Sequence, residues 1–316
     1  MNLLFQPRRE LGRTGFKATI LGIGDVADRN VPFTDCVATV RRAMDAGLNL
    51  IDTAPGYEIG YSEEIVGAAL HGRREEMFVI DKIDLHHEPV ARQVENSLKR
   101  LRIQAADLFV FHGVSTMQDW ERIAALGGGM AQLASCVKAG KTRFRGISSH
   151  HPDVLRAAIA SGCCDVVLFA VGPFSDRRFV EETLPLAREK GVGTVCFKTF
   201  GAGKLLGDTS GYNRPLEKRP RGKVSSGGKH GRDLPAQVHG RDARATLPHL
   251  SVAECVRFTL SCDPDVALLG MSFPNEQDAA FAAAAAFAPL TKQELEDLRR
   301  RAAEAIEGKG PCWWNP

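Results

Sequence analysis

The sequence lacks the patterns that mark disulfide-bonded, secreted and membrane-spanning proteins. Its eight cysteines show no C-x-x-C spacing and are too sparse for a disulfide framework, so we expect reduced thiols. The opening MNLLFQPRRELG has only four apolar residues before its charges, and no later run approaches the roughly 18 apolar residues of a membrane span. We therefore expect a cytoplasmic protein with no membrane partner.

A strong charge of one sign is also missing from the chain as a whole. The net charge is +3, and residues 214–244 alone hold nine basic residues against three acidic ones. The basic character therefore belongs to one segment, and we expect no nucleic-acid partner. Hydrophobic residues at 44% and charged residues at 25% are typical of an ordinary folded protein.

A G-x-G-x-x-G turn is absent after the first apolar run, which continues as GIGDVAD, so a Rossmann fold is not indicated. Instead, short apolar runs alternate with amphipathic segments, a pattern that predicts repeated βα units. Eight nearly continuous apolar strands predict a (β/α)₈ TIM barrel. The expected strands are residues 19–24, 48–54, 77–83, 107–113, 142–149, 165–172, 193–199 and 266–272.

Three further segments surround this single expected barrel domain of residues 1–316. RRELGRTGFKATI predicts an N-terminal β-hairpin that closes the barrel floor, and residues 291–307 predict an amphipathic helix. A basic insertion, residues 205–247, follows the seventh strand and is either a lid over a bound cofactor or a solvated loop. The tail GPCWWNP brings Trp313 and Trp314, which suit an apolar substrate or a plug on the side of the barrel.

Four polar residues are expected at the C-terminal ends of the barrel strands, where barrel enzymes place their chemistry. Asp52 ends the second strand, Lys82 lies near the end of the third, His112 ends the fourth, and Tyr57 follows Asp52 in a Pro-Gly turn. A buried carboxylate needs a partner, and Lys82 from the neighbouring strand can provide it at the same height.

These residue types predict the protonation of a carbonyl group. A cation beside a phenol favours the phenolate, so we expect Lys82 to lower the pKa of Tyr57 from about 10 and to make it a general acid. His112 can hold the carbonyl oxygen under that hydroxyl. Because no side chain delivers hydride, a nicotinamide cofactor is implied.

The sequence resembles the aldo-keto reductase family along nearly its whole length. The resemblance is carried by LGRTG, DTAPGYEIGYSEEIVGAAL, VIDKI, DLFVFHG, AGKTRFRGISSHH and ALLGMSFPNEQ. It implies NADPH- or NADH-dependent reduction of an aldehyde or ketone, with Tyr57 as the proton donor. Asp52 and Lys82 would tune Tyr57, and His112 would orient the carbonyl.

The same resemblance implies which residues bind the cofactor. Ser148 and Ser149 would hold the nicotinamide amide, Phe197 would stack on the ring, and Gly24 and Asp25 would approach the cofactor beside Asp52. The pyrophosphate and adenosine would lie near two segments, which contain Gly201 and then Met271, Ser272 and Gln277.

Two departures from the family pattern affect this cofactor site. The family usually has asparagine at Ser149 and glutamine at Leu168, so one amide contact would be missing. The loop after the eighth strand also lacks the lysine or arginine that commonly binds a 2′-phosphate, and only the basic insertion, at residues 218–232, offers that charge. The resemblance favours NADPH, and because these contacts are missing the choice between NADPH and NADH stays open.

Two alternative functions stay open alongside the reductase. A cluster of histidines near the ends of the third to fifth strands would suit a metal-dependent hydrolase or isomerase: His86, His87, His112, His150 and His151. The other alternative is a regulatory subunit that binds the cofactor without turnover. For the reductase we expect no metal, and the sequence does not indicate an oligomeric state.

Overall fold

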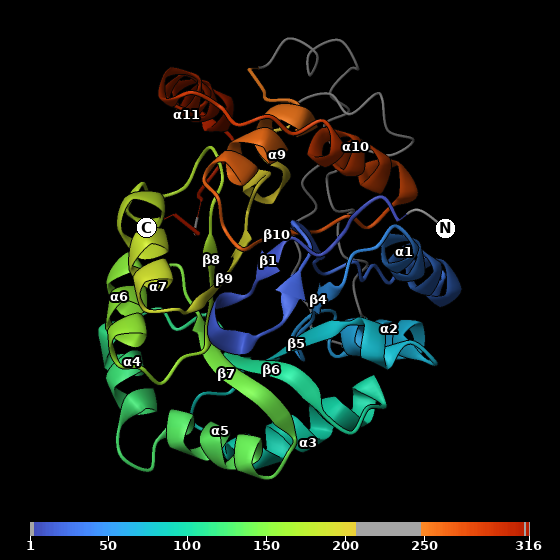
Figure 1. Ribbon diagram of the computed structural model, residues 1–316, viewed down its shortest axis with the longest axis vertical. Helices are drawn as coiled ribbons and strands as arrows, with labels where there is room; N and C mark the ends of the chain where they lie inside the picture. The colour runs from blue at the N-terminus through green and yellow to red at the C-terminus, as the bar shows by residue number, and fades with distance from the viewer. Residues whose placement is uncertain (1–2, 207–247, 313, 316) are drawn as a thin grey trace, which may run out of the picture.

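A closed barrel of eight parallel strands forms the centre of the computed structural model, which describes residues 3–206, 248–312, 314 and 315 (Figure 1). The strands follow one another around the barrel in chain order, and β10 closes it by pairing with β3. The (β/α)₈ prediction is confirmed, with all eight expected strands in place. They are β3 (Leu21–Ile23), β4 (Leu50–Asp52), β5 (Phe78–Ile83), β6 (Ala106–Phe111), β7 (Thr142–Ser148), β8 (Val166–Ala170), β9 (Gly193–Phe197) and β10 (Val266–Leu269).

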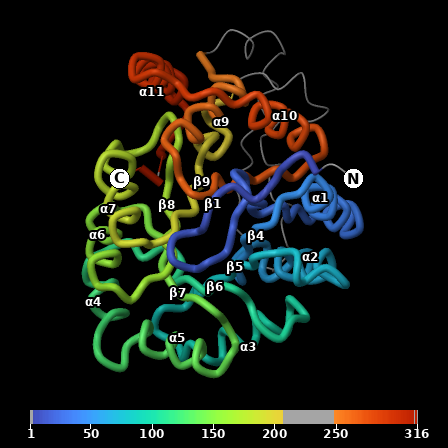
Figure 2. Tube along the Cα trace, viewed as in Figure 1, coloured from blue at the N-terminus to red at the C-terminus, as the bar shows by residue number. Residues whose placement is uncertain are grey.

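Helices surround the strands on the outside, and Figure 2 shows the chain winding around the barrel from the blue N-terminus to the red C-terminal helix. The long helices are α1 (Phe33–Asp45), α2 (Tyr61–Leu70), α3 (Val90–Leu101), α4 (Met117–Ala124), α5 (Gly129–Lys138), α6 (Pro152–Ala160), α7 (Leu184–Glu189), α9 (Val252–Ser261), α10 (Pro274–Ala285) and α11 (Lys292–Ile306). Short helical turns are η1 (Gly12–Thr14), η2 (Arg74–Glu76), η3 (Phe179–Thr183) and η4 (Gly201–Gly203).

Alternation along the strands divides the apolar residues between two cores. Leu50, Phe78 and Ile80 belong to the cluster inside the barrel. Ile51 and Val79, one residue away, belong to the larger cluster between the strands and the helices. Because successive side chains of a strand point to opposite faces, a run of apolar residues can fill both cores.

The expected N-terminal hairpin is present, and it covers the lower end of the barrel. Its strands β1 (Arg9–Glu10) and β2 (Lys17–Ala18) pair in antiparallel fashion. Leu11 between them is fully buried in the inner core. Gly12 has φ +50°, and an added Cβ would lie 2.2 Å from the backbone nitrogen of Gly193. The hairpin therefore closes the floor and leaves only the opposite end of the barrel for chemistry.

The predicted C-terminal helix is confirmed as α11, which begins with a capping box between Thr291 and Glu294. The helix α4 follows an N-cap at Thr116, whose side chain accepts a hydrogen bond from the backbone nitrogen of Asp119. Most of the basic insertion, residues 207–247, and Trp313 lie outside the described residues.

All eight cysteines are free thiols. No helix in the described part of the chain has the length and apolar character to cross a membrane.

Candidate active site

Asp52 and Lys82 form a buried ion pair at the upper end of the barrel. The Lys82 Nζ atom donates to Asp52 Oδ2 at 2.6 Å and to the backbone oxygen of Thr53 at 2.7 Å, and each of the two charged residues is 2% exposed. The strand register pairs Asp52 with Ile80. Lys82 is two residues further along β5 than Ile80, so it is the next inward-facing residue towards the upper end of the barrel. Its long side chain reaches back to the Asp52 carboxylate.

Tyr57 lies above this pair, in the turn between β4 and α2. Its ring centre is 4.5 Å from Lys82 Nζ, and the ring of His112 meets it edge-on at 5.6 Å and 85°. The turn is tight, because Glu58, Ile59 and Gly60 in succession have positive φ angles. The structure thus brings together all four residues that the sequence selected for catalysis.

Burial raises the pKa of Tyr57 to about 12, because the buried site disfavours the phenolate more than Lys82 favours it. The expectation of a lowered pKa is therefore wrong for this structure, since it counted the cation and left out desolvation. The hydroxyl is consequently protonated at neutral pH, as a proton donor must be.

Lys82 keeps its charge in spite of its burial. Burial alone would lower its pKa, but Asp52 and Tyr57 outweigh that effect and the pKa is raised overall. Asp52 Oδ1, the oxygen that does not face Lys82, is buried with no hydrogen-bond partner in the described structure. This oxygen is free to accept a hydrogen bond from a bound molecule.

Asp84 is a polar residue of the site that the sequence analysis missed. Its Oδ1 lies 2.7 Å from His112 Nδ1, and its Oδ2 accepts a hydrogen bond from the backbone nitrogen of Gly56 at 2.6 Å. A signal was available, because Asp84 follows Lys82 by two residues and period two places both on one side of an extended chain.

The residues predicted to hold the nicotinamide amide lie at the end of β7. Ser148 Oγ accepts a hydrogen bond from the backbone nitrogen of Gly113 at 3.1 Å and keeps its own proton for donation. Ser149 Oγ instead donates to the backbone oxygen of Val114 at 2.7 Å and accepts from the backbone of His151. The Ser149 hydroxyl is thus engaged within the protein, and a role in cofactor binding stays a prediction.

Phe197 ends β9 and is half-buried, with its ring 5.3 Å from that of His150. At the other side of the mouth, the backbone nitrogen of Gly24 donates to Leu269, and Asp25 lies close enough to Asp52 and Tyr57 to affect their pKa values. These strand ends therefore face the same space as the four catalytic candidates.

The segment after β10 contains three residues predicted to bind the cofactor, Met271, Ser272 and Gln277. Gln277 is fully buried and bonds to the backbone of Thr39 and to Arg42, which ties α10 to α1. Met271 is packed in the outer core. The backbone nitrogen of Ser272 donates to Glu276 Oε2 at 2.7 Å. The side chains of Gln277 and Met271 thus stabilise the barrel wall.

The C-terminal tail reaches the loop after β9. Trp314 is fully buried, with the Nζ atoms of Lys198 and Lys204 each 5.6 Å from its ring centre. An added Cβ on Gly201 would lie 3.7 Å from the Trp314 ring. The indole therefore packs against the segment that contains the predicted pyrophosphate residue Gly201.

The histidine cluster does not form a metal site in the described structure. Within residues 3–206, 248–312, 314 and 315, no group of three His, Cys, Asp or Glu side chains is arranged to hold a metal ion. His86 Nε2 instead lies 2.8 Å from the backbone oxygen of His112. The metal-dependent alternative is therefore not supported.

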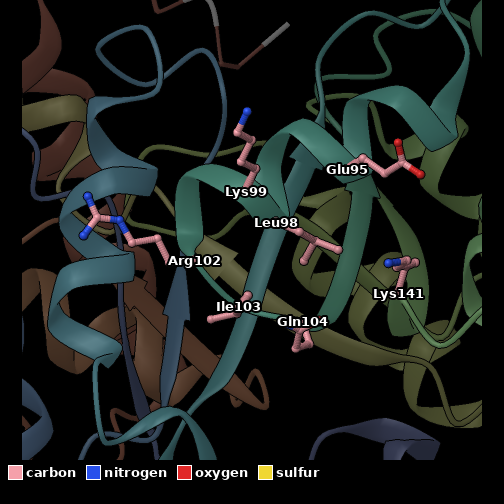
Figure 3. Close-up of a pocket in the computed structure, with 7 residues that line it drawn as sticks. All are labelled: Glu95, Leu98, Lys99, Arg102, Ile103, Gln104 and Lys141. Carbon is pink, nitrogen blue, oxygen red and sulfur yellow. The ribbon is translucent and has the colours of Figure 1, made fainter.

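Figure 3 shows a surface pocket that is remote from these residues. It is lined by Glu95, Leu98, Lys99, Arg102, Ile103, Gln104 and Lys141. These residues lie at the end of α3 and just before β6 and β7, at the lower end of the barrel. The pocket is thus separate from the catalytic candidates.

A second group of buried carboxyls lies on the outer side of β5, behind Lys82. Asp81 and Glu63 are both fully buried, and Arg100 makes two hydrogen bonds to Glu63. Burial, and after it the charge of Glu63, raises the pKa of Asp81 well above its ordinary value. Asp81 therefore binds a proton more readily in the folded protein than in the unfolded chain.

Asp81→Asn is expected to stabilise the protein at pH 8 by about 1–3 kcal/mol. A carboxyl with a raised pKa contributes stability below its unfolded pKa, and that contribution is lost as the pH rises. The advantage of the amide should thus shrink towards pH 4. Urea unfolding at several pH values measures the difference in unfolding free energy between the variant and wild type, with the exposed Asp45→Asn as control. A gain that is constant with pH would contradict the explanation.

Comparisons with known proteins agree with this geometry. A sequence model of the Aldo/keto reductase family matches residues 19–302. The chain is 30% identical over 218 residues to the aldo-keto reductase YhdN of Bacillus subtilis, covering 61% of the chain and 62% of that protein. It is 29% identical over 219 residues to a protein of Escherichia coli named NADH-specific methylglyoxal reductase, covering 62% and 66%. The chain thus matches less than two thirds of the length of either relative.

Solved structures show the same fold. The holo form of an aldo-keto reductase from Bacillus halodurans superposes with a TM-score of 0.67 at 22% identity, covering 95% of the chain and 98% of that structure. An aldo/keto reductase from Klebsiella pneumoniae, in complex with NADP and acetate, gives 0.63 at 19% identity, covering 93% and 95%. The family match extends over most of the chain and includes all four catalytic candidates, and the chain belongs to the aldo/keto reductase family.

Proposed function

We propose that this protein reduces an aldehyde or ketone to the alcohol with NADH or NADPH, with Tyr57 as the proton donor. The observation that carries the proposal is the Tyr57 ring held 4.5 Å from Lys82 Nζ, which is itself paired with Asp52 at 2.6 Å. Family membership and the names of the relatives support the same reaction class. The substrate is a small carbonyl compound.

The residues around the mouth fit a nicotinamide cofactor. Three buried polar atoms without a hydrogen-bond partner in the described structure lie in segments expected to meet it, namely Asp52 Oδ1, Thr199 Oγ1 and Asn275 Nδ2. Asp52 Oδ1 can accept from a ribose hydroxyl, Ser148 can donate to the carboxamide, and Phe197 offers an aromatic face. When bound, the nicotinamide supplies the hydride that the carbonyl carbon accepts.

The protein's own groups handle the proton. The Tyr57 hydroxyl gives its proton to the carbonyl oxygen as the new C–H bond forms, and solvent later restores the phenol. The ammonium of Lys82 stabilises the phenolate that remains after the transfer. His112 beside Tyr57 holds the carbonyl oxygen for this step.

The start of α10 favours NADH over NADPH. Glu276 Oε2 accepts from the backbone nitrogens of Ser272 and Phe273 at 2.7 and 3.2 Å, so a carboxylate already occupies these two donors. Residues 271–277 contain no lysine or arginine. If the adenosine lies here as in the family, a 2′-phosphate meets the Glu276 carboxyl, and the neighbouring cation, Arg42, is already bonded to Gln277 and Asp278.

Titration of the purified protein with NADH and with NADPH, followed by nicotinamide fluorescence, tests this proposal. We expect micromolar binding of NADH that is at least as tight as that of NADPH, and Glu276→Gln should improve NADPH binding more than NADH binding. Failure to bind either nucleotide would refute the reductase function. Tight binding without turnover of a broad carbonyl panel would favour the regulatory-subunit alternative.

A further inference from the structure

Asp84 connects the loops that carry the two residues expected to contact the substrate oxygen. One carboxylate oxygen holds the ring of His112, and the other holds the backbone of Gly56, the residue before Tyr57. The side chain of Asp84 is 22% exposed and that of His112 is 30% exposed, so both border the mouth of the barrel. The same carboxylate therefore contacts the loops after β4 and β6 from its own position after β5.

The contact with Asp84 determines which ring nitrogen of His112 carries a proton. Burial opposes the ionisation of Asp84, but the hydrogen bonds from His112 and Gly56 lower its pKa overall. An ionised carboxylate only accepts hydrogen bonds, so His112 Nδ1 must be the donor. A neutral His112 then has a lone pair at Nε2, and only the imidazolium has a second N–H group to offer a carbonyl oxygen.

Several titratable and charged groups face His112. They come from β4, β5, β7 and the loops after them: Asp52, Tyr57, Lys82, Asp84, His86 and His150. Lys82 is already paired with Asp52. Asp84 is therefore the negative charge in direct contact with the imidazole.

We propose that Asp84 is a positioning residue that fixes the ring of His112 through Nδ1, so that Nε2 faces the substrate oxygen and donates to it when the ring is charged, and that fixes the loop of Tyr57 through Gly56. This assignment rests on the proposed reductase function. The proton for the new alcohol still comes from Tyr57. Without Asp84 the ring and the loop lose a shared contact, so carbonyl reduction should be impaired while cofactor binding is kept.

The test compares Asp84→Asn with wild type in NADH affinity and in kcat/KM for NADH-dependent reduction of 4-nitrobenzaldehyde. We expect kcat/KM to fall about tenfold, because a displaced His112 and Tyr57 act less well on the carbonyl, while NADH affinity is unchanged. Asp84→Glu should restore part of the activity. The exposed Glu88→Gln, in the same loop, is the matched control and should leave kcat/KM unchanged.

A second measurement does not depend on turnover. The NMR resonance of the His112 Cε1 proton, assigned with a His112→Gln variant, should move in Asp84→Asn, because the ring loses its contact with the carboxylate. An unchanged resonance together with an unchanged kcat/KM in Asp84→Asn would overturn the assignment alone. Absence of NADH and NADPH binding by the wild type would instead overturn the proposed function, and the assignment with it.

Discussion

Tyr57→Phe is expected to lower kcat for carbonyl reduction by about 10²- to 10⁴-fold, the usual contribution of a positioned general acid. The substitution removes only the hydroxyl, and the remaining ring can keep its contacts with Lys82 and His112. NADH binding should thus be retained, so the loss appears in kcat and not in cofactor affinity. Steady-state kinetics and a fluorescence titration on the same preparation measure both quantities.

Tyr61→Phe provides the matched control. Tyr61 begins α2, and its ring packs against Phe33 at 5.8 Å and against the Arg29 guanidinium at 4.6 Å, outside the set of catalytic candidates. Its substitution should change kcat less than about twofold, since it removes no group from the reacting centre. Normal turnover by Tyr57→Phe would leave the family assignment intact and refute the proposed proton donor.

The raised pKa of Tyr57 also limits which groups can explain a loss of activity at alkaline pH. With a pKa of about 12, the phenol stays protonated through the neutral and mildly alkaline range. A decline of activity near pH 8 therefore cannot come from ionisation of Tyr57.

The barrel and its four central residues could be predicted from the sequence because they depend on local pattern and on one topological rule. Nearly continuous apolar strands such as residues 165–172 are typical of a parallel sheet, and catalytic residues lie where such strands end. Asp52 and Lys82 then become neighbours as a consequence of chain order alone. No knowledge of side-chain packing was needed for that step.

What the sequence could not supply depends on distances and burial. The sign of the Tyr57 pKa shift is a balance between a cation and desolvation, and only the folded structure shows that desolvation is larger. The spacing from Lys82 places Asp84 on the same side of the chain, but its contact with His112 is visible only in the folded structure. The burial of Gln277 between α10 and α1 is likewise visible only there.

Lys82→Met is expected to destabilise the protein by about 3–5 kcal/mol and to remove most of the activity. The change leaves the Asp52 carboxylate buried without its cation, and Asp52 Oδ1 already has no hydrogen-bond partner in the described structure. Urea unfolding at pH 8 measures the loss of stability. The exposed Lys190→Met, which breaks a surface pair with Glu189, should cost no more than about 0.5 kcal/mol.

Two further comparisons separate an uncompensated charge from lost packing. The double variant Asp52→Asn with Lys82→Met removes both charges, so it should be about 1–3 kcal/mol more stable than Lys82→Met alone while staying inactive. In the single variant the pKa of Asp52 rises, because burial is no longer opposed by Lys82. A carboxyl with a raised pKa is least costly when protonated, so the destabilisation should be smaller at pH 5 than at pH 8. Equal losses at both pH values, with no recovery in the double variant, would mean that Lys82 stabilises the barrel by packing alone.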